Sequence, residues 1–260
     1  MITIVGHMTI SLMSLFAGGN QPDLKRVAVY YGYPSLVNGA KGDLDKAAQV
    51  FNRYHIVVFG DGLEFPGAEH ENVVRLIASL DKQVLVFGYV CLGHTQKLAI
   101  PEMQHRVLLW KGTGVEGIFL DEAGKDFGVD HSRRERMVDF IHSQGLSVFV
   151  NAFQPSDVFE DGATHLGKSD FFLLESFVVR NGQPDDSKLM NTRVEQAAHY
   201  REIYKFHLVG VTTADSTPFS PALYKQACAA AHRIALDGFG WGEPSFSSQS
   251  NFLSGRDDCR

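Results

Sequence analysis

Short apolar runs recur along the chain, and their starts lie 24 to 35 residues apart. Most of the runs are continuous rather than alternating with polar residues, which is typical of parallel strands buried on both faces. We therefore predict strands that start at Val27, His55, Val84, Gly117, Ser147, Phe171, Phe206 and Leu236.

The segments between these runs mostly have apolar residues at three- and four-residue spacing, which predicts amphipathic helices. The clearest cover residues 44–54, 71–82, 101–112 and 135–145. Ser132 followed by Glu135 predicts a capping box. Ser220 before Pro221 predicts an N-cap with proline at the first helical position. The segment after the run at 147–151 leaves room only for a short helix.

Eight strand–helix units in about 250 residues match a (β/α)₈ TIM barrel. A doubly wound open sheet is the alternative, but it usually has fewer strands and opens with a glycine-rich phosphate loop. The YYGYPSL stretch after the first predicted strand is not such a loop. The expected organisation is a single α/β domain, with an N-terminal extension or weak leader at 1–24, the barrel at 25–243 and a C-terminal tail at 244–260.

Composition and charge narrow the class of partner. The chain has 260 residues, 44% of them hydrophobic, and a formal net charge of −6, which argues against nucleic acid or an anionic membrane as the partner. No stretch of the sequence is expected to span a membrane. Cys91, Cys228 and Cys259 form no CxxC pair, so we expect separate thiols rather than a disulfide framework or a zinc site. The protein is expected to be secreted if residues 1–24 act as a leader and cytoplasmic otherwise.

Carboxylates and aromatic residues dominate the ends of the predicted strands, where TIM barrels carry their catalytic groups. This composition suits a sugar, which presents hydroxyls to carboxylates and CH faces to rings. Asp215 also follows a predicted strand. The candidate substrate-binding residues are Tyr31, Tyr33, Asp61, Tyr89, His94, Asn151 and Trp241.

The stretch GIFLDEAGKDFG places adjacent acids, Asp121 and Glu122, at the end of an apolar strand. Side chains alternate along a strand, so Asp121 shares its direction with Phe119, and Glu175 in FFLLE shares its direction with Phe171. Because the two strands are both even-numbered, we expect Asp121 and Glu175 to face each other across the barrel mouth. Two opposed carboxylates are what glycoside hydrolysis requires. Glu122 points away and is expected to support them.

Two other interpretations of these acids are considered. In the structural alternative, the acids have no catalytic role, and each one only caps a loop or pairs with a cation such as Lys125 or Arg180. His94, Asp61 and Asp121 are candidate metal ligands, but no HxH or HExxH spacing supports a metal site. We therefore expect no metal and no cofactor. Serine or cysteine nucleophiles are not indicated, since GxSxG is absent and Cys91 has no evident histidine partner.

Four stretches, VAVYYGYPS, GVEGIFLDEA, VFVNAFQPSDVF and SDFFLLESF, together resemble the spherulin-like glycoside hydrolases, which are related to the endo-α-1,4-galactosaminidases. The resemblance covers residues 27–177 by motif. It implies a TIM-barrel enzyme, endo-acting and retaining, on polysaccharides that contain galactosamine or N-acetylgalactosamine. It also implies that Asp121 is the nucleophile or charge stabiliser and Glu175 the general acid/base, with Glu122 as the third acid.

The expected function is therefore hydrolysis of a carbohydrate polymer or oligosaccharide. One alternative is a non-catalytic carbohydrate-binding barrel of the same fold, although binding alone would not require an opposed pair of acids. Another is a small-molecule lyase or isomerase. Such an enzyme normally has a phosphate-binding glycine turn after strand 7 or 8, and LDGFGWGEP carries no basic residue.

Overall fold

Parallel strands close into a barrel in the computed structural model, which describes residues 23–214, 219–255 and 259. Around the barrel the strands follow the order β1-β10-β9-β6-β5-β4-β3-β2, so the predicted TIM barrel is confirmed. Its strands are β1 (Lys25–Tyr30), β2 (Ile56–Phe59), β3 (Leu85–Cys91), β4 (Gly117–Asp121), β5 (Ser147–Asn151), β6 (Phe171–Glu175), β9 (His207–Val211) and β10 (Gly238–Gly240). A small hairpin that the apolar pattern did not predict consists of β7 (Val179–Arg180) and β8 (Gln183–Pro184).

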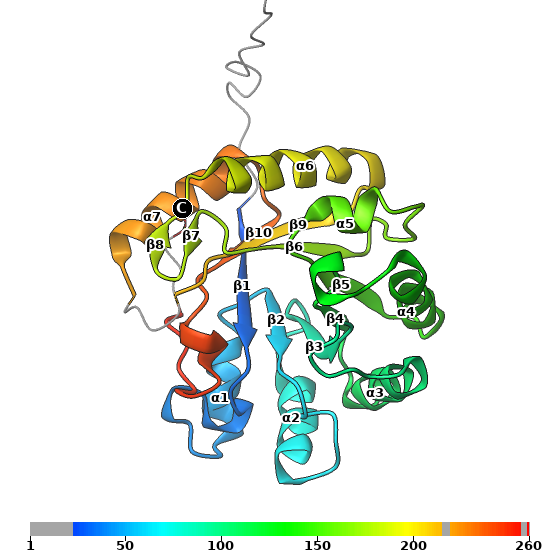
Figure 1. Ribbon diagram of the computed structural model, residues 1–260. Helices are drawn as coiled ribbons and strands as arrows, with labels where there is room; N and C mark the ends of the chain where they lie inside the picture. The colour runs from blue at the N-terminus through cyan, green and yellow to red at the C-terminus, as the bar shows by residue number, and fades with distance from the viewer. Residues whose placement is uncertain (1–22, 215–218, 256–258, 260) are drawn as a thin grey trace, which may run out of the picture.

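The helices form an outer ring around the strands (Figure 1). They are α1 (Leu44–Phe51), α2 (Ala68–Ser79), α3 (Ile100–Thr113), α4 (His131–Ser143), α5 (Pro155–Phe159), α6 (Lys188–Tyr204) and α7 (Pro221–Arg233). The structure also contains short 3₁₀ helices, which are η1 (Pro34–Gly39), η2 (Lys125–Phe127) and η3 (Pro244–Ser247). Within the described ranges, no helix is long and apolar enough to cross a membrane.

Helix starts test the predicted caps. The Ser220 side chain accepts a hydrogen bond from Leu223 N at 3.4 Å, as an N-cap should, and this prediction is confirmed. The predicted capping box at Ser132 is wrong, because α4 begins earlier and Asp130 is its N-cap, accepting from Arg133 N at 2.7 Å. A carboxylate there satisfies an exposed N–H and also interacts favourably with the helix dipole.

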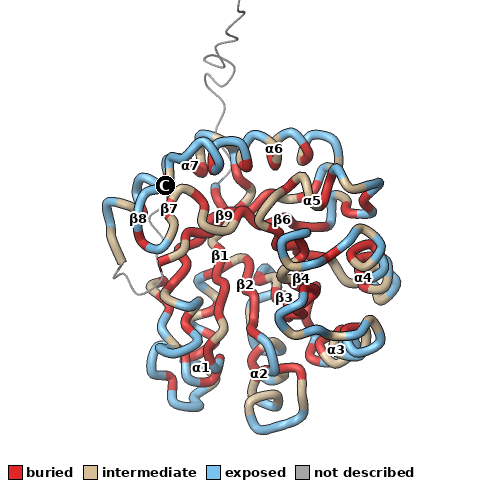
Figure 2. The backbone as a smooth tube through the Cα atoms, viewed as in Figure 1, coloured by how far each residue is buried: buried red, intermediate tan, exposed pale blue. Residues whose placement is uncertain are grey.

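The barrel interior is filled by aromatic rings below the mouth. Phe87, Phe119, Phe149 and Phe171 are buried, and neighbouring rings among them have centroids 5.2 to 5.5 Å apart. A second apolar cluster lies between the strands and the helices. Figure 2 shows the result, with buried backbone along the strands and exposed backbone on the outer sides of the helices. The packed interior gives the groups at the mouth a rigid floor.

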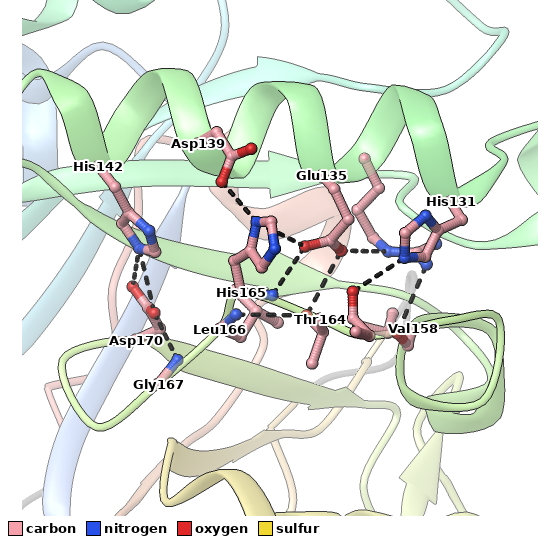
Figure 3. Close-up of polar contacts among 12 residues, drawn as sticks. His131, Glu135, Asp139, His142, Val158, Thr164, His165, Leu166, Gly167 and Asp170 are labelled. Carbon is pink, nitrogen blue, oxygen red and sulfur yellow. Dashed lines mark hydrogen bonds and ion pairs between the residues drawn. The ribbon is translucent and has the colours of Figure 1, made fainter.

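A row of polar contacts joins α4 to residues 163–170, the segment that leads into β6 (Figure 3). Asp170 is fully buried at the end of this row. Its carboxylate accepts hydrogen bonds from Val148 N and Gly167 N, each at 2.8 Å. The same carboxylate contacts His142 Nε2 at 3.0 Å. The five-residue helix α5 packs on α6 through the Phe159 ring, which stacks on Tyr200, and the polar contacts join α4 to the segment that follows α5.

Asp170→Ala is expected to lower the free energy of unfolding by about 3 kcal/mol, because it leaves the buried Val148 N–H and the partly buried Gly167 N–H without this acceptor. Urea denaturation measures the change. Asp139→Ala is the matched control: its carboxylate contacts His165 in the same row but is 58% exposed, so the expected loss is below about 1 kcal/mol. Equal losses for the two variants would contradict this account of the row.

A disulfide joins Cys228 on α7 to Cys259, so the prediction of three separate thiols is wrong. The two cysteines are 31 residues apart in the sequence and meet only because the C-terminal segment packs back along the barrel. On its way, Leu253 exchanges two backbone hydrogen bonds with the Asn38 side chain, at 2.8 and 2.9 Å. Cys91 is a free, buried thiol.

Candidate functional site

Two carboxylates converge at the mouth of the barrel. Asp121 is the last residue of β4, and Glu175 is the last residue of β6. Asn151, which ends β5, lies between them: its Nδ2 donates to Asp121 Oδ1 at 2.8 Å and to Glu175 Oε2 at 2.7 Å. Because both oxygens bind the same nitrogen, they lie within roughly 5.5 Å of each other. The alternation of side chains along the two strands predicts this convergence.

The chain turns sharply after each acid. Glu122 and Ser176, the residues that follow, have φ values of +57° and +56°, in the left-handed region. This conformation costs a residue with a side chain about 1–2 kcal/mol, and such costs are concentrated at functional sites. The two turns hold both acids at the last position of their strands.

The two acids interact electrostatically. Burial raises the pKa of the Asp121 carboxyl to about 6, and the negative charge of Glu175 acts in the same direction. Hydrogen bonds from Asn151 and Tyr89 oppose this rise, since they favour the charged carboxylate. Asp121 therefore changes its charge close to neutral pH.

Structural ion pairs do not account for the two acids in the described part of the chain. Lys125 pairs with Asp161 at 2.9 Å, and Arg180 pairs with Asp185 at 3.0 Å. Lys125 and Arg180, the two cations named in the structural alternative, are therefore paired with other acids than Asp121 and Glu175.

A cavity of about 430 Å³ opens beside the acids. Its lining residues are Asp121, Glu122, Asp126, Phe127, Asn151, Phe153, Glu175, Ser176, Arg180 and Asn181. Four of these residues are carboxylic acids and one, Arg180, is a cation, so the cavity is acidic. It therefore favours a neutral or positively charged ligand.

Arg193 on α6 supports residues of the cavity lining, and no pattern in the sequence indicates this role. The residue is fully buried. Its guanidinium donates to Phe153 O at 2.6 Å and to Glu175 O at 3.0 Å, and it also lies 4.2 Å from the centre of the Phe153 ring. Arg193 therefore ties the loop after β5 to the end of β6. A mid-helix arginine has no local sequence signal for such a role.

Two predicted tyrosines lie next to the acids. Tyr89 donates a hydrogen bond to the Asp121 carboxylate. Tyr31 meets Tyr89 edge-on, with ring centroids 5.5 Å apart. Burial raises the pKa of Tyr31, and the charges of Asp121 and Glu175 add to the effect, so its hydroxyl stays neutral.

Glu122 also reaches the cavity, because the left-handed turn redirects it. Its Oε2 accepts from Thr95 N at 3.2 Å and from Cys91 Sγ at 3.4 Å. Burial raises the pKa of Cys91 to about 11, and the backbone carbonyl of Gly93 is its other acceptor. The Cys91 thiol is therefore neutral, and it holds Glu122 in place.

Three other predicted residues lie away from the two acids. Tyr33 is 56% exposed and is not part of the cavity lining. Asp61 forms an ion pair with Arg106 at 2.7 Å. His94 lines a separate hollow of about 230 Å³, which shares Phe127 with the cavity.

Trp241 lies on the helix-facing side of the barrel. It packs against Phe219, with ring centroids 5.1 Å apart, and belongs to the outer apolar cluster. Asp215 and most of the predicted N-terminal extension lie outside the described residues. No group of His, Cys, Asp or Glu within the described part of the chain has the arrangement of a metal site.

Comparisons with known proteins identify the fold. No protein-family model and no curated protein matches the chain. A variant of the glycoside hydrolase domain of PelA from Pseudomonas aeruginosa is similar over 88% of this chain and 99% of that one, at 14% identity and a TM-score of 0.51. Another structure of that domain has the same identity and coverage and a TM-score of 0.49. At this identity the first similarity shows the barrel fold alone.

Proposed function

We propose that the protein is a glycoside hydrolase that cleaves a polysaccharide containing galactosamine or N-acetylgalactosamine. The observation that carries the proposal is the pair of carboxylates bridged by Asn151 beside a cavity. The fold shared with a glycoside hydrolase domain agrees with it. The endo-acting mode rests on the resemblance to the spherulin-like hydrolases.

The spacing of the pair favours a retaining mechanism. Retaining enzymes hold their two carboxyl groups about 5–5.5 Å apart, whereas inverting enzymes need about 6.5–9.5 Å to admit a water. The shared hydrogen-bond donor keeps the two nearest oxygens within roughly 5.5 Å. Single-step attack by a water held between the two acids is therefore disfavoured.

In the proposed first step, the Asp121 carboxylate attacks the anomeric carbon while the glycosidic C–O bond breaks. The leaving oxygen takes a proton from Glu175. In the second step Glu175 takes a proton from water, whose oxygen attacks the same carbon and releases Asp121. Asn151 donates to both acids and orients them. Proton transfer and nucleophilic attack are both supplied by side chains, so the proposed reaction uses no metal or organic cofactor.

The acidic cavity supports an amino sugar as the substrate. Asp126 and Glu122 line it in addition to the proposed catalytic pair. A protonated amine of galactosamine would meet a carboxylate on these walls. Phe127 and Phe153 offer apolar faces to the sugar ring.

Activity is expected to fall as the pH drops below about 6. The pKa of Asp121 is raised to about 6, so the proposed nucleophile is protonated and inactive below that pH, and kcat/KM should decline about tenfold per pH unit. Asn151→Ala removes a hydrogen bond that favours the charged form, so it should move the decline to higher pH. A profile of kcat/KM from pH 4 to 8 measures both effects. Full activity at pH 4 would contradict the assignment.

Digestion of defined polysaccharides tests the proposal. The panel contains α-1,4-linked galactosamine polymers, N-acetylated and de-N-acetylated, with cellulose and starch as controls. Mass spectrometry should detect short galactosamine oligosaccharides, released equally well in the presence of EDTA. No cleavage of any galactosamine polymer would overturn the proposed specificity. Loss of cleavage in EDTA with recovery on adding a divalent metal would show that the acids are metal ligands.

A further inference from the structure

The C-terminal segment 244–255 reaches into the mouth of the barrel. Tyr31 N donates a hydrogen bond to Phe246 O at 2.7 Å, and the two rings have centroids 5.3 Å apart. Both side chains are partly buried and pack against the interior cluster. The segment 244–255, which belongs to the predicted C-terminal tail, therefore contributes a ring to the mouth of the barrel.

The backbone that carries Phe246 has an unusual conformation. Ser245, Phe246 and Ser247 have φ values of +48°, +47° and +67°, so three successive residues with side chains are left-handed. Each is unfavourable for an L-residue and persists only where its surroundings enforce it. Here Ser247 Oγ donates to Phe252 O, and the Asn251 side chain accepts from Tyr33 N at 2.7 Å.

Further contacts hold the same segment against the barrel. Gly255 N donates to Tyr54 Oη at 3.0 Å, and Ser254 N donates to Glu243 Oε1 at 2.9 Å. Further along the chain, a disulfide joins Cys259 to Cys228 on α7.

The Tyr31–Phe246 ring pair borders the proposed catalytic acids. Tyr31 meets the Tyr89 ring, with centroids 5.5 Å apart, and Tyr89 is hydrogen-bonded to the Asp121 carboxylate. Neither ring lines the 430 Å³ cavity. The ring pair therefore lies outside the cavity lining but is connected to Asp121 through Tyr89.

We propose that Phe246, whose side chain is only partly buried at the barrel mouth, is a substrate-binding residue whose ring stacks on a sugar unit that lies outside the cavity. The inference rests on the proposed function, and it extends the binding site from the cavity to the C-terminal segment. Tyr31 packs against the ring at an interplanar angle of 60°. A flat aromatic face packs well on the CH face of a sugar and is already ordered before binding.

Binding to a variant that hydrolyses the substrate slowly tests the proposal. In a Glu175→Gln background, isothermal titration calorimetry measures the Kd of an α-1,4-linked galactosamine hexasaccharide. Phe246→Ala is expected to weaken binding about tenfold or more, a loss of about 1.4 kcal/mol. Phe246→Trp should bind within about threefold of the parent, because it restores a stacking face. Phe246→Leu should stay weak, because it keeps the apolar contact with Tyr31 but offers no flat ring.

Phe252→Ala is the matched control, since Phe252 lies on the same segment with 49% of its surface exposed; its Kd should be unchanged. If Phe246→Ala does not fold, judged by circular dichroism, the comparison of Phe246→Leu with Phe246→Trp decides. If Phe246→Leu, Phe246→Trp and the parent all bind with equal affinity, the stacking role is overturned and the proposed function stands. A parent that binds no galactosamine oligosaccharide overturns the proposed function, and the stacking role with it.

Discussion

Asp121→Asn is expected to abolish hydrolysis of both the natural polymer and an activated substrate such as a galactosaminyl fluoride. The substitution keeps the size of the side chain and an oxygen that can accept from Asn151, but it removes the proposed nucleophile. The expected loss is about 10⁴-fold or more on either substrate. Initial rates on the polymer and on the fluoride measure it.

Glu175→Gln is expected to discriminate between the two substrates. With the polymer, the leaving oxygen needs a proton, and the loss should be about 10²–10⁴-fold. Fluoride leaves without protonation, so the first step with the galactosaminyl fluoride should be far less impaired. Pre-steady-state release of fluoride measures that step.

Glu116→Gln is the matched control for both variants. Glu116 is exposed and immediately precedes β4, at the opposite end of the strand that carries Asp121. Its activity should equal that of the wild type. The reverse pattern, with Asp121→Asn discriminating and Glu175→Gln inactive on both substrates, would exchange the two roles. Full activity of both variants would contradict the glycoside hydrolase proposal.

Replacing Cys228 and Cys259 with serine is expected to lower the free energy of unfolding by about 3–4 kcal/mol. The bond closes a loop between residues 31 positions apart. Its removal increases the conformational entropy of the unfolded chain and so favours unfolding. Urea denaturation measures the loss. Reductant should destabilise the wild type by a similar amount and leave the double variant unchanged. A wild type whose unfolding midpoint does not respond to reductant would contradict this role for the bond.

Local pattern was sufficient to predict the barrel. A strand buried on both faces needs a continuous apolar run, and a covering helix needs an apolar stripe, so both leave a periodic signal in the sequence. The convergence of Asp121 and Glu175 followed from the same logic, because the alternation of side chains fixes their direction at the strand ends. Asn151 was predicted as a binding residue, but its bridging position depends on atomic distances that no pattern encodes.

Features that depend on distant contacts could not be predicted. The Cys228–Cys259 bond, Arg193 behind the cavity and Phe246 at the mouth all join segments that meet only after the barrel closes. Trp241 follows a strand as a binding residue would, yet its ring packs outward against Phe219. Residues beyond the last position of a strand have no fixed side, and the sequence period gives no direction for them.

Trapping the covalent intermediate tests the central claim most directly. Glu175→Gln is mixed with a galactosaminyl fluoride, quenched in acid, digested with protease and analysed by mass spectrometry. The account predicts one added galactosaminyl unit on the peptide that contains Asp121, because the first step proceeds while its hydrolysis is slow. Fluoride release with a product of inverted anomeric configuration and no adduct on that peptide would contradict the proposed mechanism.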